Sequence, residues 1–153
     1  MSAFENRIPP PIIGILAAVL MWGVSSLGPS FSLAAQFRWP LVAVLVLIGI
    51  SFDVLGILAF RKSRTTVNPL KPENASSLVV DGVYRITRNP MYVGMGFLLL
   101  AWAVHLSAWL PFAVIPLFVL ILSRFQIVPE ERMLRRIFGE DYEHYTARVR
   151  RWL

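Results

Sequence analysis

The feature that most constrains this chain is an uncharged, largely apolar stretch from residue 91 to residue 123. A helix that crosses a bilayer core of roughly 30 Å needs about 20 apolar residues. The stretch is too long for one crossing, and the turn-like residues 105–108 divide it in two. We therefore predict a tight helical hairpin. Pro111 suits the start of its return helix, because proline in a first turn loses no helical hydrogen bond, and Pro116 is expected to kink that helix.

Two further apolar segments precede the hairpin. Residues 11–27 follow two prolines, and residues 40–60 are interrupted only by Asp53. Hydrophobic residues make up 56% of the chain and charged residues only 16%, against roughly 25% charged in a typical soluble protein. A cleaved signal peptide is the alternative for the first segment, disfavoured by its long apolar core and poor cleavage site. We predict an all-α integral membrane protein, a single domain over residues 1–153 with spans at about 11–27, 40–60, 91–106 and 109–127.

The distribution of positive charge predicts the orientation. Of the fifteen Lys and Arg residues, all but Arg38 fall on one side of the predicted spans. Cytoplasmic segments carry such an excess, so both termini, loop 61–90 and tail 128–153 are expected in the cytoplasm. The small size favours a bacterial plasma membrane. Because the basic residues follow the topology rather than forming a separate patch, no nucleic-acid partner is expected.

The tail is expected to contain two short amphipathic helices. Pro129 followed by Glu130 and Glu131 suits a helix start, and Gly139 suits its end. Apolar and aromatic residues then recur at helical spacing among arginines, at Tyr142, Tyr145, Val149 and Trp152. A basic amphipathic helix lying on anionic lipid explains this composition by itself.

The densest group of polar and aromatic residues lies where loop 61–90 enters the third span, at residues 82–94. Interfacial charge with an aromatic belt is one explanation. The pattern Gly-x-Tyr-x-x-x-Arg-Asn-Pro-Met-Tyr-x-Gly resembles the signature of the isoprenylcysteine carboxyl methyltransferase family. The tail's paired glutamates, Phe138-Gly139 and spaced tyrosines are similar to that family's C-terminal pattern. The Asn-Pro-Met-Tyr segment and the glutamates also resemble phospholipid N-methyltransferases of the same superfamily.

This resemblance implies methyl transfer from S-adenosylmethionine, bound on the cytoplasmic side, to a lipid-like or prenylated acceptor that enters from the bilayer. Carried over residue by residue, it implies a cofactor site made of Ser76, Ser77, Leu78, Val79, Tyr84, Asn89, Pro90, Met91, Tyr92 and Glu130. A buried carboxylate and aromatic faces suit the cationic donor. Neighbouring glutamates on a helix point about 100° apart, so we expect Glu130 to face the site and Glu131 to meet Arg132, Arg135 or solvent.

The chain departs from the family pattern at two places, and these leave the acceptor open. Asn89 stands where the family usually has His. Gln126 and Arg124 precede Glu130 where carboxyl-methylating members carry an Arg that is thought to hold the acceptor. Arg88 and Arg124 are the predicted catalytic residues, because a guanidinium orients an anionic group by bidentate contact; an interfacial anchor is the alternative for both. An isoprenylcysteine-like carboxylate and a lipid amine both remain candidate acceptors.

Two other functions fit parts of the sequence. Membrane sterol reductases, which use NADPH, share an Arg-His-Pro-x-Tyr-like motif, and a small membrane scaffold could keep the architecture without catalysis. With no cysteine and two distant histidines, no metal site is expected. Asp53, an acid within a predicted span, is a candidate functional group or a hydrogen-bond partner for a neighbouring helix. Close helix packing best explains Gly94 and Gly96.

Overall fold

The computed structural model describes residues 8–63 and 77–153. This part of the chain is helical, with one isolated β-bridge between Ser30 and Ala108. The five α-helices are α1 (Pro10–Val24), α2 (Ala35–Lys62), α3 (Pro90–Leu106), α4 (Leu110–Leu122) and α5 (Val128–Arg148). A 3₁₀-helix, η2 (Gly82–Arg85), precedes α3, and a π-helix, η3 (Ser123–Ile127), joins α4 to α5. The all-α prediction is confirmed, and a helix occupies most of each predicted span, although α1 ends three residues before the predicted span 11–27 does.

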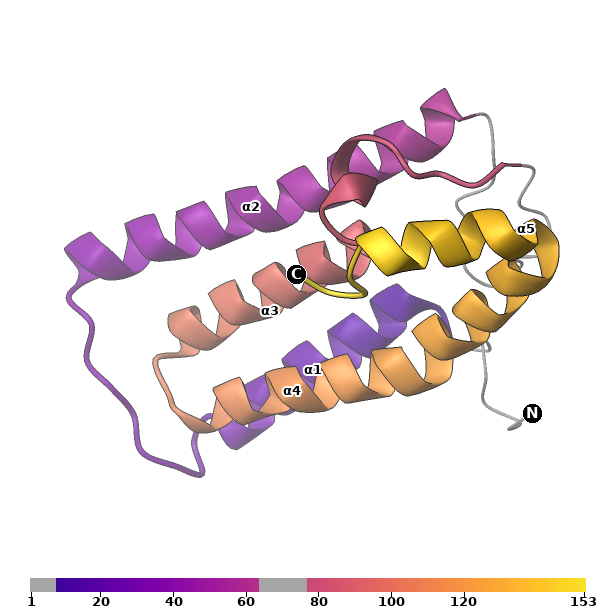
Figure 1. The fold of residues 1–153 in the computed structure, drawn as a ribbon. Coiled ribbons are helices and arrows are strands. Elements are labelled where there is room, and N and C mark those ends of the chain that lie inside the picture. Colours follow the sequence, from indigo (N-terminus) through magenta and orange to yellow (C-terminus); the bar gives the residue numbers. More distant parts are fainter. Residues whose placement is uncertain (1–7, 64–76) are drawn as a thin grey trace.

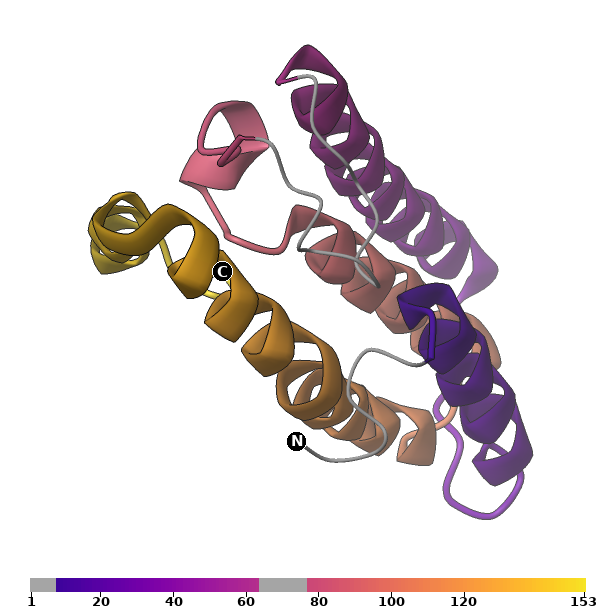
Figure 2. The same cartoon turned by 90° about the vertical axis from the view of Figure 1, so that its right-hand side faces the viewer.

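Four helices run side by side, and the fifth covers one end of them. Figure 1 shows the start of α1, the end of α2, the start of α3 and the end of α4 at the same end of the bundle, where α5 folds back. Figure 2 shows α2 beside α3, and α1 on the other side of α3. Helix α2 and the continuous helical stretch Leu110–Arg148 are long and apolar enough to cross a membrane, whereas α1 and α3 are apolar but shorter.

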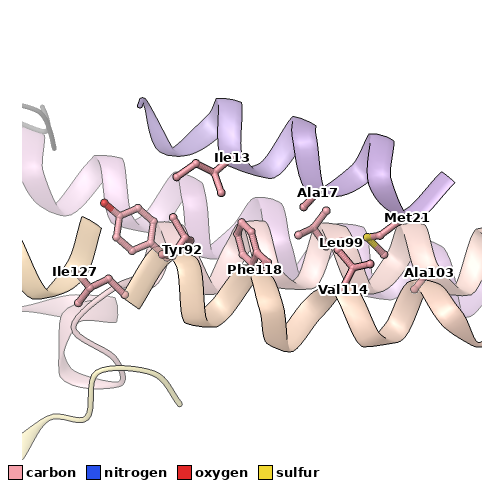
Figure 3. Packing of buried hydrophobic residues seen from close by; sticks show 10 residues of the cluster. Ile13, Ala17, Met21, Tyr92, Leu99, Ala103, Val114, Phe118 and Ile127 are labelled. Carbon is pink, nitrogen blue, oxygen red and sulfur yellow. The ribbon is translucent and has the colours of Figure 1, made fainter. Parts of the chain in front are cut away.

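The main core lies between α1, α3 and α4. Figure 3 shows Ile13 and Ala17 of α1 facing Phe118 and Val114 of α4, with Leu99 of α3 nearby. By contrast, α2 leaves most of its apolar side chains exposed, Leu47 at 64% among them. Apolar side chains on the outside of a bundle suit a lipid environment rather than water.

Helix α2 approaches α3 closely through two glycines. A Cβ atom added at Gly49 would lie 2.9 Å from the backbone oxygen of Gly94, and one added at Gly94 would lie 2.7 Å from that of Gly49. A Cβ at Gly94 would also collide with Oδ1 of Asp53. Small residues permit this kind of backbone contact between helices. Asp53 therefore packs against α3. This agrees with the second of the two roles considered from the sequence, a contact with a neighbouring helix.

Irregular geometry marks the end of the bundle that carries α5. Pro116 lies inside α4, and α-helical hydrogen bonding gives way at η3, where the Val128 N–H bonds to the Ser123 oxygen five residues earlier. Gly139 interrupts α5 with a φ of 50°, at the predicted boundary between the two tail helices. The second tail helix was predicted to include Val149 and Trp152, and this was wrong. Helix α5 ends at Arg148, and the backbone of Val149 is extended.

Candidate functional site

The first turns of α3 and α5 meet at a single hydrogen bond. Pro90 and Pro129 each stand in the first turn of their helices, and Tyr92 and Glu130 follow them closely. The Tyr92 hydroxyl donates to Oε1 of Glu130 across 2.6 Å. The Tyr92 ring is buried against the core, and Figure 3 shows its oxygen directed away from Phe118. Two segments separated by nearly forty residues therefore form one polar centre.

Burial dominates the electrostatics of this centre. It raises the pKa of Glu130 to about 8, and the hydrogen bond from Tyr92 opposes that rise in part, while the adjacent Glu131 adds to it. Burial also raises the pKa of Tyr84 above its usual value, and the charges of Tyr145 and Glu130 raise it further. The centre thus holds a carboxyl group that is mainly neutral at pH 7 and ionises readily if a cation comes close.

Tyr84 is positioned by η2 and by the tail. The Tyr145 hydroxyl donates to the Tyr84 backbone oxygen across 2.8 Å. The Tyr84 ring meets Phe60 of α2 edge-on, with 5.5 Å between the ring centroids, and packs with Val79 and Val83. Gly82 permits the turn into η2 because its φ is 63°, a conformation that glycine adopts without strain. Buried contacts therefore fix Tyr84 beside the Tyr92–Glu130 centre.

Glu131 faces away from that centre and is paired with two arginines. Arg151 Nε and Nη2 donate to its two carboxylate oxygens at 2.9 and 2.7 Å, and Arg88 Nη1 lies 3.2 Å from Oε1. The division of roles between the two glutamates agrees with their helical spacing. The prediction that Glu131 meets Arg135 or solvent was wrong, since Glu131 is buried and Arg88 and Arg151 hold it, while Arg135 pairs with Glu143 at 2.9 Å.

The last residues return to the motif that precedes α3; we call residues 149–153 the C-terminal strap. The backbone N–H of Arg88 donates to the Arg150 oxygen at 2.9 Å. The Arg151 oxygen accepts from Thr87 Oγ1 at 3.1 Å and from Asn89 Nδ2 at 2.9 Å. Trp152 Nε1 donates to Ser123 Oγ at 3.1 Å. Asn89, predicted to contact a cofactor, therefore directs its side-chain amide to the strap.

The other predicted site residues are spread along the same end of the molecule. Ser76 lies outside the described residues, and Ser77 Oγ donates to the Ser63 oxygen at 3.0 Å. Val79 and Pro90 are buried. The Met91 side chain packs against Gly56 of α2, where an added Cβ atom would lie 3.0 Å from Met91 Cγ. Arg124 is exposed, with its guanidinium 5.6 Å from the Phe125 ring centroid.

An open cleft of about 880 Å³ lies beside this group, between the segment before η2 and the second half of α5. It has the size of a small-molecule site. Its lining residues are Leu78, Val80, Phe138, Asp141, His144, Tyr145, Ala147 and Arg148. Of the described residues predicted to bind the cofactor, Leu78 is the one that lines this cleft. Across residues 8–63 and 77–153, no three His, Asp or Glu side chains gather as metal ligands would.

Sequence reasoning missed two residues that organise this end of the bundle. Thr87 is fully buried and bonds to the strap, although it stands at a variable position of the motif. In the sequence, Arg151 is one more arginine beside Arg148 and Arg150. A tail whose helical spacing fails after Arg148 carried no signal that would separate Arg151 from Arg150.

Comparison with known proteins agrees with this architecture. The chain belongs to the phospholipid methyltransferase family, whose pattern matches residues 38–141. It is 36% identical over 111 residues to a probable protein-S-isoprenylcysteine O-methyltransferase of Oryza sativa subsp. indica, covering 69% of this chain and 56% of that protein. It is 31% identical over 110 residues to protein-S-isoprenylcysteine O-methyltransferase B of Arabidopsis thaliana, covering 69% and 53%.

A bacterial relative covers a shorter stretch. An uncharacterized protein of Haemophilus influenzae is 40% identical over 63 residues, which is 41% of this chain and all of that protein. No solved structure is significantly similar to the chain. The chain spans about half the length of the plant relatives, and the motif and tail that carry the Tyr92–Glu130 centre lie largely within the matched family region.

Proposed function

We propose that this protein is an integral membrane methyltransferase that transfers a methyl group from S-adenosylmethionine to a lipid-like or prenylated acceptor. The observation that carries the proposal is the 2.6 Å hydrogen bond between Tyr92 and Glu130. It joins the two motifs that resemble those of membrane methyltransferases into one partly buried polar centre. Family membership and the relatives' names support the same reaction class.

The residues of the centre suit a cationic methyl donor. Glu130 is a partly buried carboxyl group, and the tyrosine rings of residues 84 and 92 offer electron-rich faces nearby. A cation is stabilised by such faces and by a carboxylate. The hydrogen-bonding backbone of residues 77–79 is a candidate for the polar parts of the donor. Asn89, Pro90 and Met91 would support the centre through packing and through the strap.

The chain would promote transfer mainly by position. When bound, S-adenosylmethionine supplies a methyl group on a positively charged sulfur, which becomes a neutral thioether as the acceptor's electron pair forms the new bond to carbon. Glu130 would balance the positive charge, and Tyr92 would fix the orientation of its carboxylate. The surrounding apolar core would exclude the water that solvates a nucleophile. A carboxylate acceptor loses no proton in the reaction, whereas an amine or hydroxyl acceptor loses one.

The two arginines predicted to be catalytic take different roles in this proposal. Arg88 would act through Glu131, because its guanidinium is largely buried and paired there. Arg124, which is exposed on η3, is the candidate for contacting an anionic group at the membrane surface. We propose four spans, with both termini, loop 61–90 and tail 128–153 on the cytoplasmic face of a bacterial plasma membrane, because the described basic residues other than Arg38 gather at the end of the bundle that carries α5.

Binding of labelled S-adenosylmethionine to the detergent-solubilised protein tests the proposal. We expect saturable binding that S-adenosylhomocysteine competes away and NADPH does not. Glu130→Gln should weaken it by about 10- to 100-fold, the cost of losing a charge-assisted contact. Glu140→Gln, an exposed glutamate on the same helix, should bind like the wild type. Competition by NADPH would favour a reductase, and equal binding by the wild type and Glu130→Gln would remove the site assignment.

Incubation with membrane lipid extract tests the reaction itself. Lipids heavier by one CH₂ group should accumulate with the wild-type protein and S-adenosylmethionine, and should fail to accumulate with Glu130→Gln. Binding without any methylated product across bacterial and prenylated-peptide acceptors would leave a cofactor-binding scaffold as the better description.

A further inference from the structure

A second site is built between α1 and α4, apart from the Tyr92–Glu130 centre. The two helices leave an apolar groove of about 350 Å³, the size of a small-molecule site. Apolar side chains form its walls, among them Ile13, Leu16, Val114, Leu117 and Phe118. The polar side chain that lines it is Gln126 of η3. The groove therefore suits a hydrocarbon chain with one polar end.

The amide of Gln126 is only half satisfied. Its Nε2 donates to the backbone oxygen of Ile8, which fixes the direction of the amide. Its Oε1 is buried, since the residue is only 1% exposed, and it has no hydrogen-bond partner among residues 8–63 and 77–153. An unpaired buried acceptor destabilises the fold, because it has lost its hydrogen bonds to water and gained none in return. A buried acceptor without a donor needs an explanation, and a donor on a bound molecule or an ordered water provides one.

Ile8, whose backbone oxygen accepts from Gln126, is not tightly packed. Ile8 lines the same groove, stands before the first turn of α1 and is 39% exposed. Ile8 and Gln126 thus line the same groove, and the backbone that holds the Gln126 amide lies outside the regular turns of α1. The π-helical geometry of η3 also brings Gln126 into the groove, and such insertions occur often at functional sites.

We propose that the groove between α1 and α4 binds a lipid-like molecule whose hydrocarbon chain lies on the two helices and whose polar end donates an N–H or O–H hydrogen bond to Gln126 Oε1. A carboxylate is disfavoured there, because it offers only acceptors to an acceptor. Gln126 stands four residues, about one helical turn, before Glu130. Resting on the function proposed above, we assign this molecule as the methyl acceptor and Gln126 as the residue that selects an amine or hydroxyl over a carboxylate.

Photoaffinity labelling tests the site without any cofactor. Two probes share one alkyl diazirine chain and differ in their heads, one a primary alcohol and one a carboxylate. With the protein in detergent, peptide mass spectrometry should find the alcohol probe on residues of α1 and α4 that line the groove. Its labelling should exceed that of the carboxylate probe by about tenfold, as one satisfied buried acceptor allows.

Variants of the protein test separately how the groove binds the alkyl chain of a probe and how Gln126 binds its polar head. Gln126→Leu should label equally with both probes, and Gln126→Arg should prefer the carboxylate. Leu117→Trp narrows the rim of the groove and should reduce labelling by both probes, whereas Leu120→Trp, an exposed leucine of the same helix outside the groove, should not. Monodispersity and thermal melting check that each variant folds.

The outcomes distinguish this inference from the proposed function. Equal labelling of the wild type by both probes would overturn the role of Gln126. Labelling spread over the lipid-facing surface, unaffected by Leu117→Trp, would overturn the groove. Neither result depends on S-adenosylmethionine binding, so loss of cofactor binding alone would affect the assignment as an acceptor and leave the lipid site intact.

Discussion

The hydroxyl of Tyr92 lies 2.6 Å from a carboxylate oxygen of Glu130, so the first turn of α3 and the first turn of α5 share one hydrogen bond. Glu131, the next residue, turns to the opposite side and closes an ion pair with Arg151. One pair of adjacent acids therefore serves two purposes. Glu130 remains available inside the bundle end, and Glu131 anchors the C-terminal strap.

Removing the Tyr92 hydroxyl tests how the first acid is held. In Tyr92→Phe, the ring stays in the core while Glu130 loses its donor, so S-adenosylmethionine should bind about tenfold more weakly at pH 7. Isothermal titration on the solubilised protein measures this. The loss should shrink at higher pH, because the missing hydrogen bond favoured the ionised carboxylate. A loss that is the same at every pH would mean that Tyr92 contacts the ligand directly and does not act through Glu130.

The pKa of Glu130 predicts a pH dependence of binding. Burial raises this pKa to about 8, so the free protein holds a mainly neutral carboxyl group at pH 7. A cation binds better to the ionised form, and its affinity should therefore rise with pH, by roughly tenfold per unit below the pKa, and level off above it.

A matched ligand isolates the role of the sulfur charge. S-adenosylhomocysteine has the same amino group and a neutral sulfur, so the ratio of the two affinities should rise between about pH 6 and pH 8 and then stay constant. In Glu130→Gln this ratio should not change with pH. A ratio independent of pH in the wild type would place the sulfonium away from Glu130.

The sequence predicted the helices better than the contacts of the tail. Apolar length and the absence of charge define spans because the bilayer imposes both, and the four segments at 11–27, 40–60, 91–106 and 109–127 all appear as helices. A shared site for Tyr92 and Glu130 was expected from the resemblance to membrane methyltransferases, whose two motifs flank the hairpin. The spans depend on composition and order, which a single sequence contains.

The strap could not be predicted for a physical reason. Helical spacing assigns a side chain to a face only while the helix continues, and α5 ends at Arg148. Beyond that point Arg150 and Arg151 are equivalent in sequence, although one is exposed and the other binds Glu131. The groove between α1 and α4 could not be predicted either. One of its walls is α1, which lies outside both motifs, so no sequence pattern linked α1 to Gln126.

The contact between α2 and α3 predicts opposite effects for two neighbouring glycines. Gly94→Ala places a methyl group against Asp53 and the Gly49 backbone, so it should cost about 1–3 kcal/mol of folding free energy and lower the melting temperature. Gly96→Ala has no atom within 4 Å of the new Cβ and should be neutral or slightly stabilising, since alanine favours helix. Thermal melting in detergent compares them. Adding Asp53→Ala to Gly94→Ala should restore part of the lost stability, because it removes the clash with the Asp53 side chain. The restoration should be incomplete, because the clash with the Gly49 backbone remains.

The strap predicts a difference between adjacent arginines at the end of the chain. Arg151→Ala removes two hydrogen bonds to Glu131, but Arg88 still pairs with that carboxylate and the Arg151 side chain is partly exposed, so we expect a loss of only about 1–2 kcal/mol. The strap should then detach, and limited proteolysis should cleave the chain after Arg148 faster than in the wild type. Arg150→Ala should behave like the wild type, because Arg150 contributes its backbone oxygen to the strap while its side chain is exposed. Equal cleavage of the two variants would show that the backbone bonds to Thr87, Arg88 and Asn89 hold the strap without the ion pair.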